Sequence, residues 1–304
     1  MIVRPPQHWF LSLFNWRGSV LPNIVSRLSL NLLVSVSAVI LLPYYDSLGL
    51  HLTTAPFSLV GIAIAIFLGF RTNTSYARFN EARCLWGMLL IVTRSISRQV
   101  RSILNDNADG RLVAQFLIAF SWSLNHQLRG TDSRNDLERL LPEPYLSDVL
   151  SSPLRTNRIL LLLGEWLGQK YRAGQITDIL YADIDKNLNE MAHIQGACER
   201  ISNTPIPYAY GLILRRTVYL FCTILPFAFV DDLRYLTPMI SVFISYTFLS
   251  LEYVAEEIEE PFGTAPNDLA LDAMCTTIEI NQMEMNGIQP LPAFMVPDKN
   301  YKLT

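Results

Sequence analysis

The sequence is poor in charge and lacks the short motifs by which many enzymes are identified. Of its 304 residues only 17% are charged, whereas soluble domains carry about 25%. Its four histidines are isolated and its four cysteines show no Cys-x-x-Cys spacing, so neither a metal site nor a disulfide framework is predicted. The sequence contains no nucleophile elbow, phosphate-binding loop or glycine-rich dinucleotide turn. We therefore predict a protein that is not an enzyme and requires no cofactor.

The net charge is also small. The chain has 24 Lys and Arg residues against 27 Asp and Glu residues, which gives a formal net charge of −3. Such a balance argues against a nucleic-acid surface, which needs an excess of positive charge. Half of the residues are hydrophobic, so a large buried or lipid-facing surface is expected. We predict a lipid bilayer as a partner, and no nucleic acid.

Four uncharged stretches are candidates for membrane helices. Leu28–Tyr45 and Leu48–Phe70 have 18 and 23 residues without Lys, Arg, Asp or Glu, and a hydrocarbon core about 30 Å thick needs about 20 helical residues. Ile213–Val230 and Tyr235–Leu251 are predicted to form two further spans joined by a tight turn. The prediction is therefore four transmembrane helices, with a soluble helical region between the second and the third.

Charge placement predicts the topology. Of the 24 Lys and Arg residues, 18 lie between Arg71 and Arg216, three precede the first span and two follow residue 298. Positive residues are concentrated on the cytoplasmic side of membrane proteins. Both termini and the long middle segment are therefore expected to be cytoplasmic.

The second uncharged stretch has two distinctive faces. At 100° per residue, one narrow sector holds Leu59, Ile62, Ile66, Phe70, Asn73 and Ala77. Gly61, Ala65 and Gly69 form a ridge of small residues beside it, which allows another helix to approach closely. Two arrangements fit this pattern: a symmetric ring of helices around a tight, dry constriction, or an ordinary membrane helix packed in a bundle.

Four motifs carry a resemblance to a known family. They are RTNTSYARFNEARCLWG (Arg71–Gly87), NWRGSVL (Asn15–Leu21), ISNTPIPYAY (Ile201–Tyr210) and EEIEEPFGTAPNDL (Glu256–Leu269). Together they resemble the bestrophin family, in particular its bacterial branch, and they span about residues 4–285 in the family order. The resemblance implies an all-α membrane protein that assembles as a homopentamer around one axial ion pore. It also implies location in the bacterial inner membrane.

The resemblance assigns roles to particular residues. It implies a hydrophobic pore neck at Ile62, Ile66 and Phe70, where the alternative is lipid-facing packing. The polar segment that follows is expected to line the inner pore mouth, where Asn73 and Ala77 lie in the same sector as the neck residues. The alternative is an interfacial helix turn. A second, cytosolic constriction is expected near Ile176, Ile179 and Leu180, for which packing in a core is the alternative.

Glu257, Glu260 and Asp268 lie in the segment that corresponds to the calcium clasp of animal bestrophins. Here Thr264 and Ala265 stand where that clasp has acidic residues, so at most a weak divalent-cation site is expected. The glutamates around this segment are expected instead to contact the N-terminal arm through Arg4 or Arg17.

The expected organisation of the chain has five parts: an N-terminal amphipathic arm (1–27), transmembrane helices with the neck (28–83), a cytosolic helical region (84–204), two further transmembrane helices (205–260) and a C-terminal cytosolic segment (261–304). The predicted function is passive flux of small monovalent ions. The acidic balance leans towards cations such as Na⁺, because rings of carboxylates favour them. Alternatives are an anion (chloride) channel of the same architecture, a secondary transporter and a non-conducting membrane scaffold.

Overall fold

The computed structural model of the chain describes residues 1–304 except 6–7, 13–14, 17, 48, 50–52 and 105. In the described residues the regular structure is helical, apart from one isolated bridge between Ile2 and Lys302. The all-α prediction is therefore confirmed. The chain forms two compact units, which we call the apolar-helix unit (Pro5–Phe79 and Pro205–Glu260) and the polar-helix unit (Met1–Arg4, Asn80–Thr204 and Pro261–Thr304).

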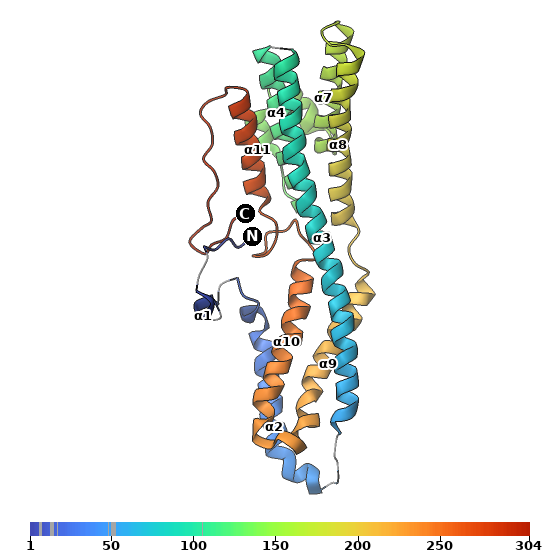
Figure 1. Cartoon of the computed structure of the whole chain (residues 1–304), viewed down its shortest axis with the longest axis vertical. Helices are drawn as coiled ribbons and strands as arrows, with labels where there is room; N and C mark the ends of the chain where they lie inside the picture. The colour runs from blue at the N-terminus through green and yellow to red at the C-terminus, as the bar shows by residue number, and fades with distance from the viewer. Residues whose placement is uncertain (6–7, 13–14, 17, 48, 50–52, 105) are drawn as a thin grey trace. The chain divides into compact units, whose positions relative to one another are not determined.

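The apolar-helix unit is built from long helices. It contains α1 (Trp9–Ser12), α2 (Leu21–Ser47), the first part of α3 (Thr54–Ile103), α9 (Tyr208–Leu233), a 3₁₀ turn (Arg234–Leu236) and α10 (Thr237–Glu257). Helices α2, α9 and α10 pack against one another (Figure 1). Their shared core includes Ile24, Val218, Leu225 and Leu249, to which α3 adds Ile64.

Helix α2 begins earlier and ends later than the sequence predicts. The uncharged stretch indicated Leu28–Tyr45, but the helix runs from Leu21 to Ser47 with Pro43 inside it. Pro22 lies in the first turn, where its missing N–H would have no helical partner. The Ser19 hydroxyl accepts a hydrogen bond from the Leu21 N–H at 3.2 Å. Charge therefore located the span but not the helix ends.

Helix α3 is a single element of 50 residues. It contains no proline after Pro56, and proline is the commonest cause of a sharp helix break. The helix crosses the boundary between the two units, because its residues up to Phe79 belong to the apolar-helix unit and the following ones to the polar-helix unit. The second uncharged stretch and the basic segment after it therefore form one continuous helix.

Among the residues that the structure describes, three helical segments are long and apolar enough to cross a membrane. They are Leu21–Tyr45, Thr54–Ile103 and Tyr208–Glu257. The third contains both α9 and α10 with the short 3₁₀ turn between them. The four predicted spans thus fall on three segments, of which one holds two helices.

The polar-helix unit contains shorter helices. They are α4 (Asn107–Arg129), α5 (Arg134–Leu140), α6 (Tyr145–Ser151), α7 (Arg155–Arg172), α8 (Asp178–Asn203) and α11 (Leu271–Met285), besides the later part of α3. Helix α4 packs against α5, α7 and α11, and α7 also packs against α8 (Figure 1). The Asp106 carboxylate caps α4 by accepting the Ala108 N–H at 2.8 Å, so the helix begins earlier than its apolar residues indicate.

The four cysteines differ sharply in accessibility, which gives a simple test of the fold. Cys84 is exposed, whereas Cys198, Cys222 and Cys275 are buried. Burial raises the pKa of the Cys198 thiol to about 12 and holds the pKa of Cys275 well above its usual range. The thiolate is the reactive form, so we expect a maleimide at neutral pH to add a single label per native chain. Intact-mass spectrometry of the protein and of Cys84→Ser would measure this, and persistent labelling of the variant would contradict the packing.

Candidate functional site

The proposed neck residues lie on an exposed face of α3. Ile62, Ile66 and Phe70 are 60%, 52% and 60% exposed within the single chain. Asn73 and Ala77, on the same side of the helix, are also exposed. Large apolar side chains in such a row need a lipid or protein partner, because their burial stabilises by about 25 cal/mol per Å². The row is therefore available either to lipid or to further copies of the chain.

The opposite face of α3 is buried in the apolar-helix unit. Ile64 and Leu68 are 3% and 1% exposed, and Ser75 is fully buried. The buried residues recur every three to four positions, which is the spacing expected for a helix with one buried side. Packing against the unit thus orients the Ile62, Ile66 and Phe70 side chains away from the core of their own chain.

The ridge of small residues is divided by the structure. A Cβ built on Gly61 would lie 3.3 Å from Cζ of Phe221 in α9, so Gly61 permits close packing within the chain. Ala65 and Gly69 are exposed, and a Cβ on Gly69 would meet no described atom within 4 Å outside its own stretch of helix. Of the three residues predicted to pack against another helix, Gly61 contacts α9 of the same chain. Ala65 and Gly69 face outward.

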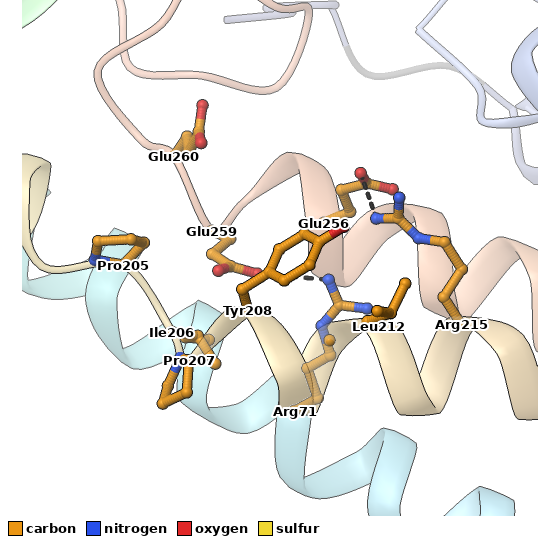
Figure 2. Close-up of a pocket in the computed structure, with 11 residues that line it drawn as sticks. Arg71, Pro205, Ile206, Pro207, Tyr208, Leu212, Arg215, Glu256, Glu259 and Glu260 are labelled. Carbon is orange, nitrogen blue, oxygen red and sulfur yellow. Dashed lines mark hydrogen bonds and ion pairs between the residues drawn. The ribbon is translucent and has the colours of Figure 1, made fainter.

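A charged cluster lies on the buried side of α3. Its members were not predicted to be partners. Arg71 donates from Nη1 to Glu252 Oε1 at 3.3 Å. It also donates from Nη2 to Glu259 Oε2 at 3.3 Å (Figure 2). Arg215 of α9 donates to Glu252 Oε1 at 3.1 Å and also pairs with Glu256. Arg71 and Glu252 are 3% and 0% exposed. The pair is thus a buried one, in contrast to most surface ion pairs.

One expectation concerns these same glutamates and stays a prediction. The glutamates were expected to contact Arg4 or Arg17 of the N-terminal arm. The Arg4 guanidinium lies over the Tyr301 ring, 4.9 Å from its centroid, and Arg17 lies outside the described residues. In the described part of the apolar-helix unit, Arg71 pairs with Glu252 and Glu259, and Arg215 pairs with Glu252 and Glu256. The sequence holds one signal that cations are needed here, though not which ones: Glu252 and Glu256 are one helical turn apart, directly after an uncharged span.

Several of these charged residues, though not Glu252, line a cavity of about 430 Å³. Its wall is formed by the segment from Pro205 to Tyr208, the first turns of α9, Arg71, and the glutamates at 256, 259 and 260 (Figure 2). Two guanidinium groups and three carboxylates meet there, and the Arg71–Glu259 and Arg215–Glu256 pairs join them. The cavity is therefore polar on one side and bounded by proline and isoleucine on the other.

The residues proposed for the cytosolic constriction have different environments. Ile176 is buried in the polar-helix unit and Leu180 is half-buried, whereas Ile179 is 81% exposed. Thr177 caps α8, which places Ile179 in its first turn. Of the three, Ile179 is the side chain that a neighbouring copy or an ion could reach. Ile176 is buried in the core of its unit, which fits the alternative that this segment packs in a core and does not line a pore.

The clasp-like residues differ in burial. Asp268 is buried, and its Oδ2 accepts the Ala265 N–H at 2.6 Å. Glu257 is half-buried and Glu260 is exposed. No group of three or more His, Cys, Asp or Glu residues in the described part of the chain is placed to hold a metal ion. The weak divalent site thus stays a prediction.

Near this segment, Asp272 forms a tight pair with Arg129. Burial of Asp272 would raise the pKa of its carboxyl, but hydrogen bonds from Arg129 and Asn125, both at 2.7 Å, hold the pKa below its usual value. The Arg129 guanidinium also donates to the Phe262 carbonyl oxygen at 3.3 Å. Arg129 therefore ties the start of α11 and the loop before it to α4.

Comparison with known proteins places this arrangement in a family. The sequence profile described as Bacterial/Fungal Bestrophin protein matches residues 1–284. The chain is 52% identical, over the full length of both chains, to a protein of Escherichia coli K12 named voltage-dependent anion channel-forming protein YneE. It is 45% identical to the Ralstonia nicotianae voltage-dependent anion channel-forming protein RSc3414, over 92% of each chain.

A solved structure extends the comparison to the fold. The crystal structure of a bacterial bestrophin homologue from Klebsiella pneumoniae superposes with a TM-score of 0.86 at 58% identity. The match covers 88% of this chain and 100% of the homologue. The resemblance inferred from the four motifs is confirmed, and the chain belongs to the bacterial and fungal bestrophin family.

Proposed function

We propose that this chain is the subunit of an ion channel that conducts small monovalent ions passively through a hydrophobic neck. The observation that carries the proposal is the exposed row Ile62, Ile66 and Phe70 on an uninterrupted helix of 50 residues. Relatives that match the chain over its whole length are named channel-forming proteins. An apolar ring offers an ion no ligand, so conduction would depend on wetting of the neck.

The proposed assembly is a homopentamer in the bacterial inner membrane, with one axial pore. The first two spans would be α2 and the start of α3, and α9 and α10 would form the other two. The concentration of basic residues between Arg71 and Arg216 supports cytoplasmic termini and a cytoplasmic middle region. Asn73 and Ala77 would line the inner mouth, and Ile179 would provide the cytosolic constriction.

Two observations favour opposite ion signs. The relatives with 45–52% identity carry names that specify anions, which supports chloride and similar ions. The acidic balance of the chain and its carboxylate-rich segment from Glu252 to Glu260 support cations such as Na⁺. Family membership, together with the names of these relatives, confirms the prediction that the protein is not an enzyme.

Recording from purified protein in planar bilayers tests the proposal. Unitary currents are expected, and their reversal potential under a salt gradient reports the ion sign directly. Currents that reverse at the chloride potential support the anion channel, and currents that reverse at the cation potential support the Na⁺-type channel. Coupled, saturable uptake without unitary currents would indicate a transporter, and a silent protein that remains assembled would indicate a scaffold.

Calcium is expected to have little effect on this channel. A tight calcium site needs six to eight oxygen ligands, several of them carboxylates. Thr264 and Ala265 provide no carboxylate, and the Asp268 carboxylate already accepts the Ala265 N–H. We expect the same open probability with a chelator and with micromolar calcium on the cytosolic side. Reversible activation of several-fold that is lost in Asp268→Ala would show that this loop binds calcium.

A further inference from the structure

Arg71 lies where it can control the position of the neck helix. It follows Phe70 directly, but its side chain lies on the buried side of α3. Its two terminal nitrogens contact Glu252 in α10 and Glu259 just beyond α10, each at 3.3 Å. A guanidinium held by two carboxylates has a defined direction as well as a favourable charge interaction.

Two other contacts hold the same stretch of α3. The Tyr210 hydroxyl of α9 donates to the Phe67 carbonyl oxygen at 3.3 Å. Arg78 donates from Nε to the Glu259 carbonyl oxygen at 3.2 Å. Helix α3 is therefore attached to the rest of the apolar-helix unit at residues 67, 71 and 78. These attachments lie on both sides of Phe70.

We propose that the ion pairs of Arg71 with Glu252 and Glu259, here called the Arg71 clamp, hold the neck helix back from the pore axis and so set the width of the neck. Glu252 and Arg71 are thus positioning residues for ion flux, although they do not face the exposed row. The inference rests on the proposed channel function. It adds to that function a charged, buried determinant of permeation outside the apolar neck.

Two opposing forces act on the neck helix. The exposed apolar row on α3 gains free energy when it meets the same row on other copies, which draws the neck together. The Arg71 clamp opposes this movement, because it ties α3 to α10 on the side away from that row. Removing one carboxylate leaves the Arg71 guanidinium with less compensation in a buried site and weakens the tie. The neck then narrows and becomes harder to wet.

Glu252→Gln is the direct test, and Glu256→Gln is its matched control. Both remove one carboxylate from the same face of α10, one turn apart. Of these two glutamates, Glu252 contacts Arg71 as well as Arg215, whereas Glu256 pairs with Arg215 and its side chain is 44% exposed. In planar bilayers we expect the Glu252→Gln current to fall about tenfold, which corresponds to a modest rise of the free-energy barrier to ion passage through the neck. Glu256→Gln is expected to stay within about twofold of the wild type.

A second variant separates a narrowed neck from a damaged fold. Adding Ile66→Ala to Glu252→Gln removes apolar bulk from the neck, so we expect it to restore most of the current. A damaged fold would not be repaired by a further truncation. A Glu252→Gln current equal to that of Glu256→Gln, a raised current, or a loss that Ile66→Ala does not restore would each overturn the inference.

A distance measurement tests the inference without ion flux. In a Cys84→Ser background, spin labels on Asn73→Cys report the spacing between α3 helices of neighbouring copies. We expect Glu252→Gln to shorten this spacing and Glu256→Gln to leave it unchanged. If the wild type passes no current, the channel proposal fails, but this measurement still tests whether the Arg71 clamp holds the α3 helices apart. An unchanged spacing in Glu252→Gln would overturn the clamp.

Discussion

Replacing Ile62, Ile66 and Phe70 together with alanine is expected to raise the single-channel conductance at least about tenfold, the effect of lowering a barrier by about 1.4 kcal/mol. In the proposed neck, each side chain narrows the passage and provides no oxygen to replace the water around an ion. Alanine at all three positions widens the passage and lets water remain continuous through it. Recording in planar bilayers measures the change, and Ile66→Ala alone should give a smaller increase.

A matched control is needed because these side chains are also candidates for lipid contact. Ile40 of α2 is 69% exposed, similar to the three neck residues, and lies on a different helix. Ile40→Ala should leave the conductance unchanged. Truncation of a packed apolar residue lowers stability, by roughly 2–5 kcal/mol when it is fully buried. If the triple variant has wild-type currents and only a lower melting temperature, the exposed row packs against lipid or protein and does not form the neck.

The helical fold and the long neck helix could be predicted because they depend on local pattern. An uncharged apolar stretch without a break, followed by RTNTSYARFNEARCLWG, indicated one helix that leaves the apolar segment and continues into a polar one. Periodicity also separated Ile62 and Ile66 from the buried residues Ile64 and Leu68. Helix ends were less predictable, because Ser19 and Asp106 act as caps before the apolar pattern begins.

The charged cluster could not be predicted, because it depends on residues far apart in the chain. Arg71, at the end of the second uncharged stretch, and Glu252, in the last span, are separated by 181 positions. In the sequence, Arg71 only marks the end of an uncharged stretch. Arg215 only resembles an arginine whose side chain reaches the membrane interface. Only the packing of α3, α9 and α10 shows that these charges are partners.

Gly69→Leu is expected to abolish the assembly, whereas Gly61→Leu should mainly destabilise the single chain. Gly69 is exposed and a Cβ on it would meet no described atom within 4 Å outside its own stretch of helix, so a leucine there extends towards lipid or another copy. If copies approach closely along this ridge, the larger side chain keeps them apart. At Gly61, a new side chain would instead press on Phe221 of the same chain, with the first carbon already at 3.3 Å. Overpacking of this kind costs typically about 1–3 kcal/mol.

Native mass spectrometry and thermal unfolding distinguish these two outcomes. We expect Gly69→Leu to give smaller species than the wild-type oligomer, and Gly61→Leu to keep the oligomer at a lower melting temperature. Gly69→Ala is the matched control, because a methyl group enters open space and adds little bulk at the close approach. An intact oligomer with leucine at position 69 would mean that the ridge faces lipid. The close approach of α3 helices at Gly69, and with it the packing proposed around the neck, would then be wrong.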